Sequence, residues 1–138
     1  MPLFVREGAI VPMLLPGVQT LCDANYVNNP NIKTPDSGLL FQIYPGGTSQ
    51  FTVYDGTQIQ CALNGNSIVV TLTSIARPVL LQILGDAPSA ILRDGAALPQ
   101  RGTQAELDAA VTGWHFDSST RFISIKFQHS GGSTKIAL

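Results

Sequence analysis

Three aromatic side chains with polar neighbours are the strongest candidates for chemistry in this chain of 138 residues. A flat, exposed ring beside amides, imidazoles or carboxylates is what a sugar-binding surface needs. The CH groups on one pyranose face meet the electron-rich ring, while the polar groups bond the hydroxyls. The one tryptophan and the three tyrosines are the possible aromatic platforms: Trp114, Tyr26, Tyr44 and Tyr54. We expect the sugar to stack on Trp114, Tyr26 or Tyr54, with His115, Asp117 and Asn28 as the polar candidates beside them.

Each aromatic candidate also has a structural alternative. Trp114 and Phe116 are two residues apart, so on a strand they share one face, and packing into a core is the alternative for Trp114. Tyr26 lies in an Asn-rich stretch, and such a stretch is also ordinary for an irregular connection. The Tyr54 hydroxyl could simply cap the turn at Asp55-Gly56. His115 alternates with Trp114 and Phe116, so we expect it to face solvent.

The sequence indicates neither a catalytic pair nor a metal site. Glycosidases need two carboxylates that flank the scissile bond, whereas the Asp and Glu residues here lie mostly in turns and caps. There is no G-x-S-x-G motif, and the only histidines are His115 and His129. Cys22 and Cys61 lack C-x-x-C spacing, which leaves a disulfide and two buried thiols as open alternatives. We therefore predict no metal and no cofactor.

Composition restricts the class of partner. The net charge is −1 and only 12% of the residues are charged, so no basic patch exists to attract nucleic acid or an anionic membrane. No apolar run approaches the ~20 residues of a membrane span. A polar but weakly charged surface suits neutral partners, which makes polysaccharides and oligosaccharides the expected ligands.

Hydrophobic alternation of period two indicates an all-β chain. We predict an antiparallel β-sandwich with at most one short helix. Asn64-Gly65 predicts a hairpin with a type I′ turn. Thr103 followed by Glu106 matches a capping box and predicts the short helix. The expected strands cover residues 4–5, 9–14, 39–44, 50–54, 58–63, 67–73, 79–84, 90–93, 113–116, 121–127 and 134–137.

Three sequence motifs resemble a known enzyme family. Residues 2–13 read PLFVREGAIVPM, residues 40–47 read LFQIYPGG and residues 51–56 read FTVYDG. Together they resemble the region that follows the catalytic barrel in glycoside hydrolase family 31. The family's Y-[DE]-x-D-G turn is shortened here to Tyr54-Asp55-Gly56, with fewer acids, and no residue matches the family's catalytic motifs.

The resemblance implies a non-catalytic piece of a larger enzyme. It implies one β-sandwich over residues 1–138, in which 1–38 are the remnant of a preceding C-terminal domain and 39–138 form the distal-type sandwich. The long connection from Leu15 to Gly38 fits that boundary. Because residues 4–14 are rich in apolar side chains, we expect this leader to pair onto the sandwich and bury against it.

Two functions follow from the resemblance. The first is a non-catalytic carbohydrate-binding module, with α-glucans as the expected sugars because the family is rich in α-glucosidases. The second is a structural accessory domain that supports the parent catalytic domain and binds no ligand of its own. An exposed aromatic beside a shallow groove favours the first function, and a contiguous apolar face favours the second.

Overall fold

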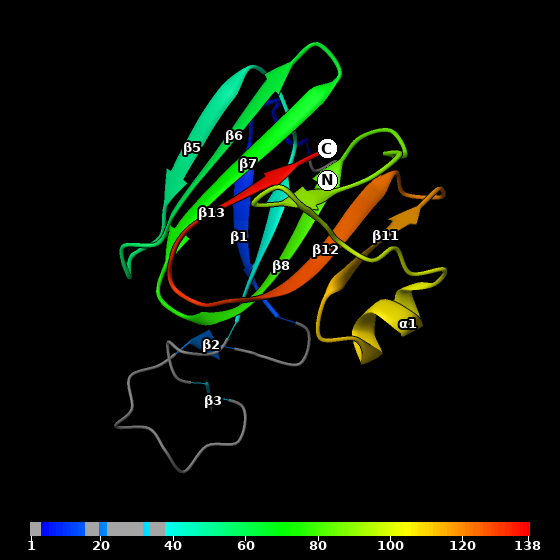
Figure 1. Cartoon of the computed structure of the whole chain (residues 1–138). Coiled ribbons are helices and arrows are strands. Elements are labelled where there is room, and N and C mark those ends of the chain that lie inside the picture. The colour runs from blue at the N-terminus through cyan, green and yellow to red at the C-terminus, as the bar shows by residue number, and fades with distance from the viewer. Residues whose placement is uncertain (1–3, 16–19, 22–31, 34–37) are drawn as a thin grey trace.

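Two β-sheets stack face to face in the computed structural model, which describes residues 4–15, 20–21, 32–33 and 38–138 (Figure 1). The prediction of an all-β sandwich with one short helix is confirmed. The elements are β1 (Ile10–Leu14), β2 (Thr20–Leu21), β3 (Ile32–Lys33), β4 (Leu39–Ile43), β5 (Thr48–Thr52), β6 (Gln58–Asn64), β7 (Ser67–Ser74), β8 (Arg77–Leu84), β9 (Leu92–Arg93), β10 (Ala96–Ala97), α1 (Gln104–Ala109), β11 (Gly113–Asp117), β12 (Phe122–His129) and β13 (Gly132–Ala137).

The strands divide between a five-stranded and a six-stranded sheet. The first has the order β1-β4-β8-β12-β11 and the second the order β10-β9-β13-β7-β6-β5. Pairing is antiparallel within both sheets except between β4 and β8, which run parallel. A short parallel pair of β2 and β3 stands apart from both sheets. The β4–β8 pair is thus the one parallel pair within two sheets that are otherwise antiparallel, as the sequence predicts.

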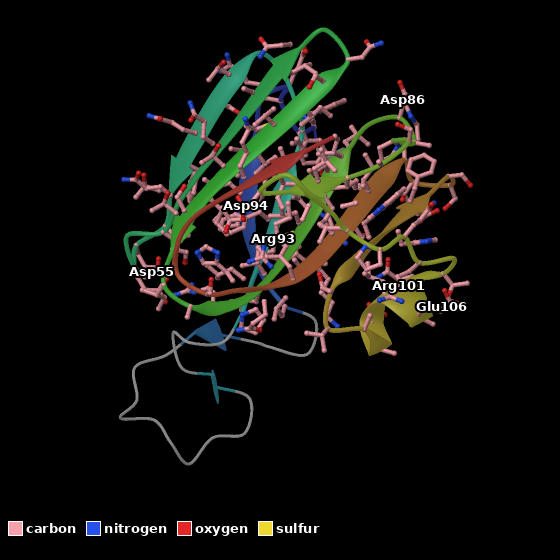
Figure 2. All side chains as sticks on the ribbon, viewed as in Figure 1. Asp55, Asp86, Arg93, Asp94, Arg101 and Glu106 are labelled. Carbon is pink, nitrogen blue, oxygen red and sulfur yellow. The ribbon has the colours of Figure 1, made fainter. Side chains whose placement is uncertain are left out.

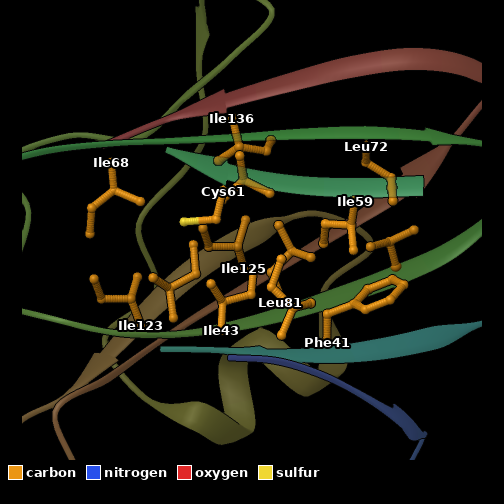
Figure 3. Close-up of a cluster of buried hydrophobic side chains, with 14 of the residues drawn as sticks. Phe41, Ile43, Ile59, Cys61, Ile68, Leu72, Leu81, Ile123, Ile125 and Ile136 are labelled. Atoms are coloured by element: carbon orange, nitrogen blue, oxygen red, sulfur yellow. The ribbon is translucent and has the colours of Figure 1, made fainter. Parts of the chain in front are cut away.

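The core lies between the two sheets, where alternate residues of each strand meet (Figure 3). Ile59 and Cys61 of β6 face Leu81 of β8 and Ile125 of β12, and all four are at most 1% exposed. This is the outcome of period-two alternation, because every second residue of a strand points to the same face. Cys61 is a buried free thiol, and burial raises its pKa to about 11. Cys22 lies outside the described residues.

The leader pairs with the sandwich in part. β1 forms the edge strand of the five-stranded sheet, with Ile10 opposite Ile43 and Leu14 opposite Leu39. Ile10 is buried, but Met13 is 41% exposed and Phe4 is 88% exposed. The strand and the burial expected at residues 4–5 are therefore wrong, because this segment lies beyond the pairing with β4.

The turn and cap predictions hold with changes in detail. Asn64 pairs with Ser67, so Gly65 and Asn66 are the central residues of the hairpin. Only Gly65 has a positive φ, of 61°, which fits a type II′ turn rather than the expected type I′.

The predicted helix cap is present. The Thr103 hydroxyl accepts a hydrogen bond from the Glu106 N–H of α1, as predicted. The Glu106 carboxylate accepts a hydrogen bond from the N–H of Gly102, whereas the capping box would use the N–H of Thr103.

Within the described residues no helix is long and apolar enough to cross a membrane.

Candidate carbohydrate-binding surface

Tyr54 is the predicted aromatic that the structure exposes. It lies in the turn between β5 and β6, and 74% of its surface is accessible. Its neighbour Val53 points into the core and is 7% exposed. The chain therefore turns at this point so that one apolar residue anchors the hairpin and the aromatic residue stays in solvent.

Asp55 fixes the shape of that turn. Its Oδ1 accepts a hydrogen bond from the Thr57 N–H at 2.9 Å, and the Val53 N–H donates to the Thr57 carbonyl at 2.8 Å. Gly56 has a φ of 85°, a conformation that residues with a Cβ adopt at a cost. The Asp-Gly sequence after Tyr54 is thus the local cause of a tight turn, and it pre-organises the backbone that carries the ring.

A buried ion pair ties the same turn to the core. Arg77 begins β8 and is 1% exposed, and its Nη2 lies 2.7 Å from Asp55 Oδ2. The N–H groups are not aligned for a hydrogen bond, so charge attraction holds this contact. Burial opposes ionisation of Asp55, but the hydrogen bonds from Thr57 and the positive charge of Arg77 outweigh it, and the pKa of Asp55 is lowered.

More buried polar groups gather at this end of the sandwich. His129 is fully buried opposite Arg77. Its Nε2 lies within 3.3 Å of the Ser74 and Gly132 carbonyls, and its Nδ1 lies 3.1 Å from the Thr134 hydroxyl. Both nitrogens of the buried His129 ring therefore have polar partners, as most buried polar groups do. The role of the cluster is therefore to support the turn and close the core.

A shallow groove of about 150 Å³ runs over β5, β6 and β7 up to that turn. Thr52 and Gln58 are paired neighbours at its end, and they are the strand residues next to the Tyr54 turn. Amides and hydroxyls can both donate and accept hydrogen bonds, and none of the groove residues is charged. The residues that line it are Gln50, Phe51, Thr52, Gln58, Ile59, Gln60, Thr71 and Thr73, although the Ile59 side chain itself points into the core.

The structure corrects the expectation for Trp114. Its indole is 3% exposed and belongs to the inter-sheet core, so it has no free face for a sugar. The ring nitrogen donates to the Leu98 carbonyl at 3.2 Å. Core packing, the alternative that the sequence left open, is what the structure shows. The physical reason is that β11 presents Trp114 and Phe116 to the same face, and that face is the inner one.

His115 and Asp117 have local partners. His115 lies on the outer face, as alternation predicts, where it is half-buried with Nδ1 3.1 Å from the Arg101 carbonyl. Asp117 accepts hydrogen bonds from the Ser119 hydroxyl and N–H and from the Thr120 hydroxyl, and these lower its pKa to about 2. Without Trp114 as a platform, neither residue lies beside an exposed ring. Tyr26 and Asn28 lie outside the described residues.

Sequence reasoning missed the groove. The signal was present as polar residues that alternate with the buried ones: Gln58 and Gln60 on β6 alternate with Ile59 and Cys61. What the sequence lacked was the strand order, which places β5, β6 and β7 side by side. In the part of the chain that the structure describes, no group of three His, Cys, Asp or Glu side chains could hold a metal ion.

Comparisons with known proteins place this fold in larger enzymes. No family model matches the chain. An isomaltosyltransferase from Sporosarcina globispora is 28% identical over 148 aligned residues, which cover 100% of this chain and 13% of that protein. The cycloalternan-forming enzyme from Listeria monocytogenes, solved with a pentasaccharide substrate, has a similar fold with a TM-score of 0.79, 23% identity and coverage of 96% of this chain and 13% of its own.

The third match is an enzyme of glycoside hydrolase family 31 (GH31). A GH31 dextranase from Flavobacterium johnsoniae, solved with isomaltotriose, has a TM-score of 0.72, 19% identity and coverage of 96% of this chain and 19% of its own. The comparisons confirm the resemblance to glycoside hydrolase family 31. The chain spans only 13–19% of the length of these family 31-like enzymes. The matched part is all-β in the described residues, which contain no catalytic barrel.

Proposed function

We propose that this chain is a non-catalytic accessory domain that binds neutral α-glucans through Tyr54 and the groove beside it. One observation carries the proposal: a largely exposed tyrosine lies on a turn locked by Asp55, two residues after Thr52, which lines a groove rich in amides and hydroxyls. Because the backbone of this turn is already fixed, a sugar that stacks on Tyr54 has only the side chain to order, which favours binding.

The groove composition supports a neutral, hydroxyl-rich ligand. No charge lines the groove, so it offers little attraction to phosphate or ammonium groups. Its Gln and Thr side chains can bond successive hydroxyls of a chain that stacks on Tyr54. The relatives support the same ligand class, since the dextranase was solved with isomaltotriose and the cycloalternan-forming enzyme with a pentasaccharide.

The expected affinity is low. A single ring and a few hydrogen bonds that replace water contribute ~1 kcal/mol each, so dissociation constants should lie between about 1 μM and 1 mM. Binding of this strength keeps a polymer near the domain without trapping it. We expect no hydrolysis of α-glycosides by the chain alone, because the residues that the structure describes form no barrel that could carry the two catalytic carboxylates.

Affinity electrophoresis in gels that contain dextran or starch tests the proposal. Tyr54→Ala should abolish retardation, while Tyr54→Trp, which keeps a flat ring, should retain it. Because Tyr54 is mostly in solvent, both variants should unfold at nearly the wild-type temperature, which circular dichroism checks. Equal retardation of Tyr54→Ala and wild type would show that this ring is not the platform.

A second variant tests the groove itself. Gln60→Ala with Thr71→Ala removes a directly paired amide and hydroxyl from the middle of the groove. Binding should weaken about fivefold for each lost hydrogen bond, by the ~1 kcal/mol that such a bond contributes. The matched control is Gln128→Ala, an exposed glutamine on β12 of the other sheet. If this double variant binds dextran as tightly as wild type does, the groove does not contact the sugar, and the contact is limited to the Tyr54 turn.

A structural accessory role is the second candidate function. It is favoured by the apolar side chains that remain exposed near β1, since Phe4 is 88%, Val5 40% and Met13 41% accessible. Under this alternative the chain binds no glycan on a broad panel, and it stabilises a catalytic domain of the parent enzyme when the two are expressed together. Dextran or starch retardation that depends on Tyr54 would reject it.

A further inference from the structure

A second hollow lies at the opposite end of the sandwich from Tyr54. Arg77 and Leu84 are the two ends of β8, and an eight-residue strand spans about 25 Å. Figure 2 shows Asp55 at one end of the molecule and Asp86, just beyond β8, at the other. The hollow at this far end measures about 310 Å³, within the usual size of a small-molecule site.

Hydrogen bonds between separate segments hold the walls of this hollow. The Gly8 N–H donates to the Tyr44 carbonyl at 2.7 Å, and the Tyr44 N–H donates to the Ala9 carbonyl at 2.9 Å. A Cβ on Gly46 would collide with Glu7 Cγ and lie 2.7 Å from the Gly8 nitrogen, so only glycine lets Glu7 lie so close. Glu7 and Tyr44 are thus brought together by backbone contacts.

Tyr44 supplies an aromatic wall. Its ring is half-exposed and meets Phe122 edge-on, with centroids 5.9 Å apart, which fixes the ring plane. The Tyr44 hydroxyl donates to Gln42 Oε1 at 3.3 Å and keeps its lone pairs as acceptors.

Charged groups of both signs surround the ring. Arg121 lines the hollow and pairs with Asp86 at 2.6 Å, although both side chains are mostly exposed. Arg121 has a φ of 61°, the left-handed conformation that ends the turn between β11 and β12. The Gly85 N–H donates to the Arg121 carbonyl at 3.0 Å and holds this turn against the end of β8.

The mixture of charges selects the ligand class. An anion would meet the Glu7 carboxylate, and the charge of Arg121 that would attract it is already paired with Asp86. A cation would meet Arg121, so the neighbouring charges oppose either kind of ligand. A neutral ligand with adjacent hydroxyls avoids both conflicts, because Arg121 can donate to one hydroxyl while a carboxylate accepts from the next. We propose that the Glu7–Tyr44–Arg121 hollow is a second sugar-binding site, which takes a pyranose with vicinal hydroxyls.

A larger hollow continues from this site. It measures about 450 Å³ and shares Pro45, Leu84 and Gly85 with the Tyr44 hollow, so the two meet at these residues. Asn66 and Ser89 add an amide and a hydroxyl to its lining. The end of the sandwich therefore has room for further sugar units beyond the one that contacts Tyr44.

Two sites on one rigid domain make it bivalent toward a polymer. Once one site holds a glucan chain, the same chain is held close to the second site and binds there at a high effective concentration. The affinity for the polymer then exceeds the affinity of either site alone. This inference goes beyond the proposed function, and it shares with that function the class of ligand, so the test must report on the two sites separately.

An NMR titration can report on the two sites separately. Isomaltotriose is added to the isotopically labelled chain, and the signal of each residue is followed. We expect two sets of shifted signals, one around Tyr54 and one around Glu7, Tyr44 and Arg121.

A double variant tests the second site. The paired substitution Glu7→Gln with Arg121→Gly should weaken the second site at least tenfold and leave the Tyr54 set unchanged. Glycine accepts the positive φ at 121, so this variant preserves the fold. Asp94→Gly is the matched control, since Asp94 is also a charged residue with positive φ in a tight turn.

A dextran gel then reports the avidity. The apparent affinity of wild type for dextran should be about 100-fold higher than that of either single-site variant, which is the low end of what linked sites give. Shifts around Tyr54 alone would overturn the second site and leave the proposed function standing. Shifts around Tyr44 alone would support this site and overturn the Tyr54 platform, and no shifts at either place would overturn both.

Discussion

The two ends of the sandwich use charge in opposite ways. At the Tyr54 end, Asp55 and Arg77 pair inside the protein, with 13% and 1% of their side chains exposed. At the Tyr44 end, Arg121 and Asp86 pair at a similar distance but are 61% and 93% exposed. The same pair of residue types therefore serves a structural purpose at one end and is available to a ligand at the other.

Burial explains the difference. A buried pair has given up its water, so loss of one partner leaves a charge that nothing solvates. An exposed pair exchanges freely with water and contributes little to stability. At one end the fixed charges hold a turn that presents an aromatic ring, and at the other the free charges can themselves bond a sugar.

The largest test of this comparison is removal of the buried carboxylate. Asp55→Asn should lower the free energy of unfolding by about 3–5 kcal/mol, because Arg77 is left buried without its counter-charge. Chemical denaturation measures this loss. Asp86→Asn is the matched control at the exposed pair and should leave the midpoint unchanged. Similar losses in both variants would mean that the two ends do not differ.

Acid should remove the same interaction. The pKa of Asp55 is lowered in the folded state, so its contribution is fully present above the unfolded value of 3.8 and is lost as pH falls through the folded value. The stability gap between wild type and Asp55→Asn should therefore shrink below pH 3.8, while other carboxylates affect both proteins equally. Denaturation curves at several pH values check this, and a gap that widens in acid would contradict it.

Salt gives the smallest expected effect. At about 1 M salt the screening length falls to ~3 Å, which weakens exposed pairs far more than buried ones. The gap between wild type and Asp55→Asn should persist in such a buffer, whereas any small gap for Asp86→Asn should vanish. Thermal melts at low and high salt measure both, and loss of the Asp55 gap in salt would show that water reaches the pair.

The sequence by itself determined the elements and much of their chemistry. Period-two alternation over residues such as Ile59 and Cys61 determines a strand with one apolar face, and Thr103 and Glu106 determine a helix start from local hydrogen bonds. The family 31 resemblance also came from local motifs. Each of these signals depends on neighbours in the chain, so a single sequence contains them.

Only the tertiary structure decided which faces meet water. Trp114 and Tyr54 are both aromatic residues with polar neighbours, yet the stacking of the sheets buries the first and leaves the second exposed. The Arg77 partner of Asp55 is distant in sequence, and Glu7, Tyr44 and Arg121 come from three separate segments. Strand order and sheet packing bring these residues together, because long-range contacts depend on the whole fold rather than on local periodicity.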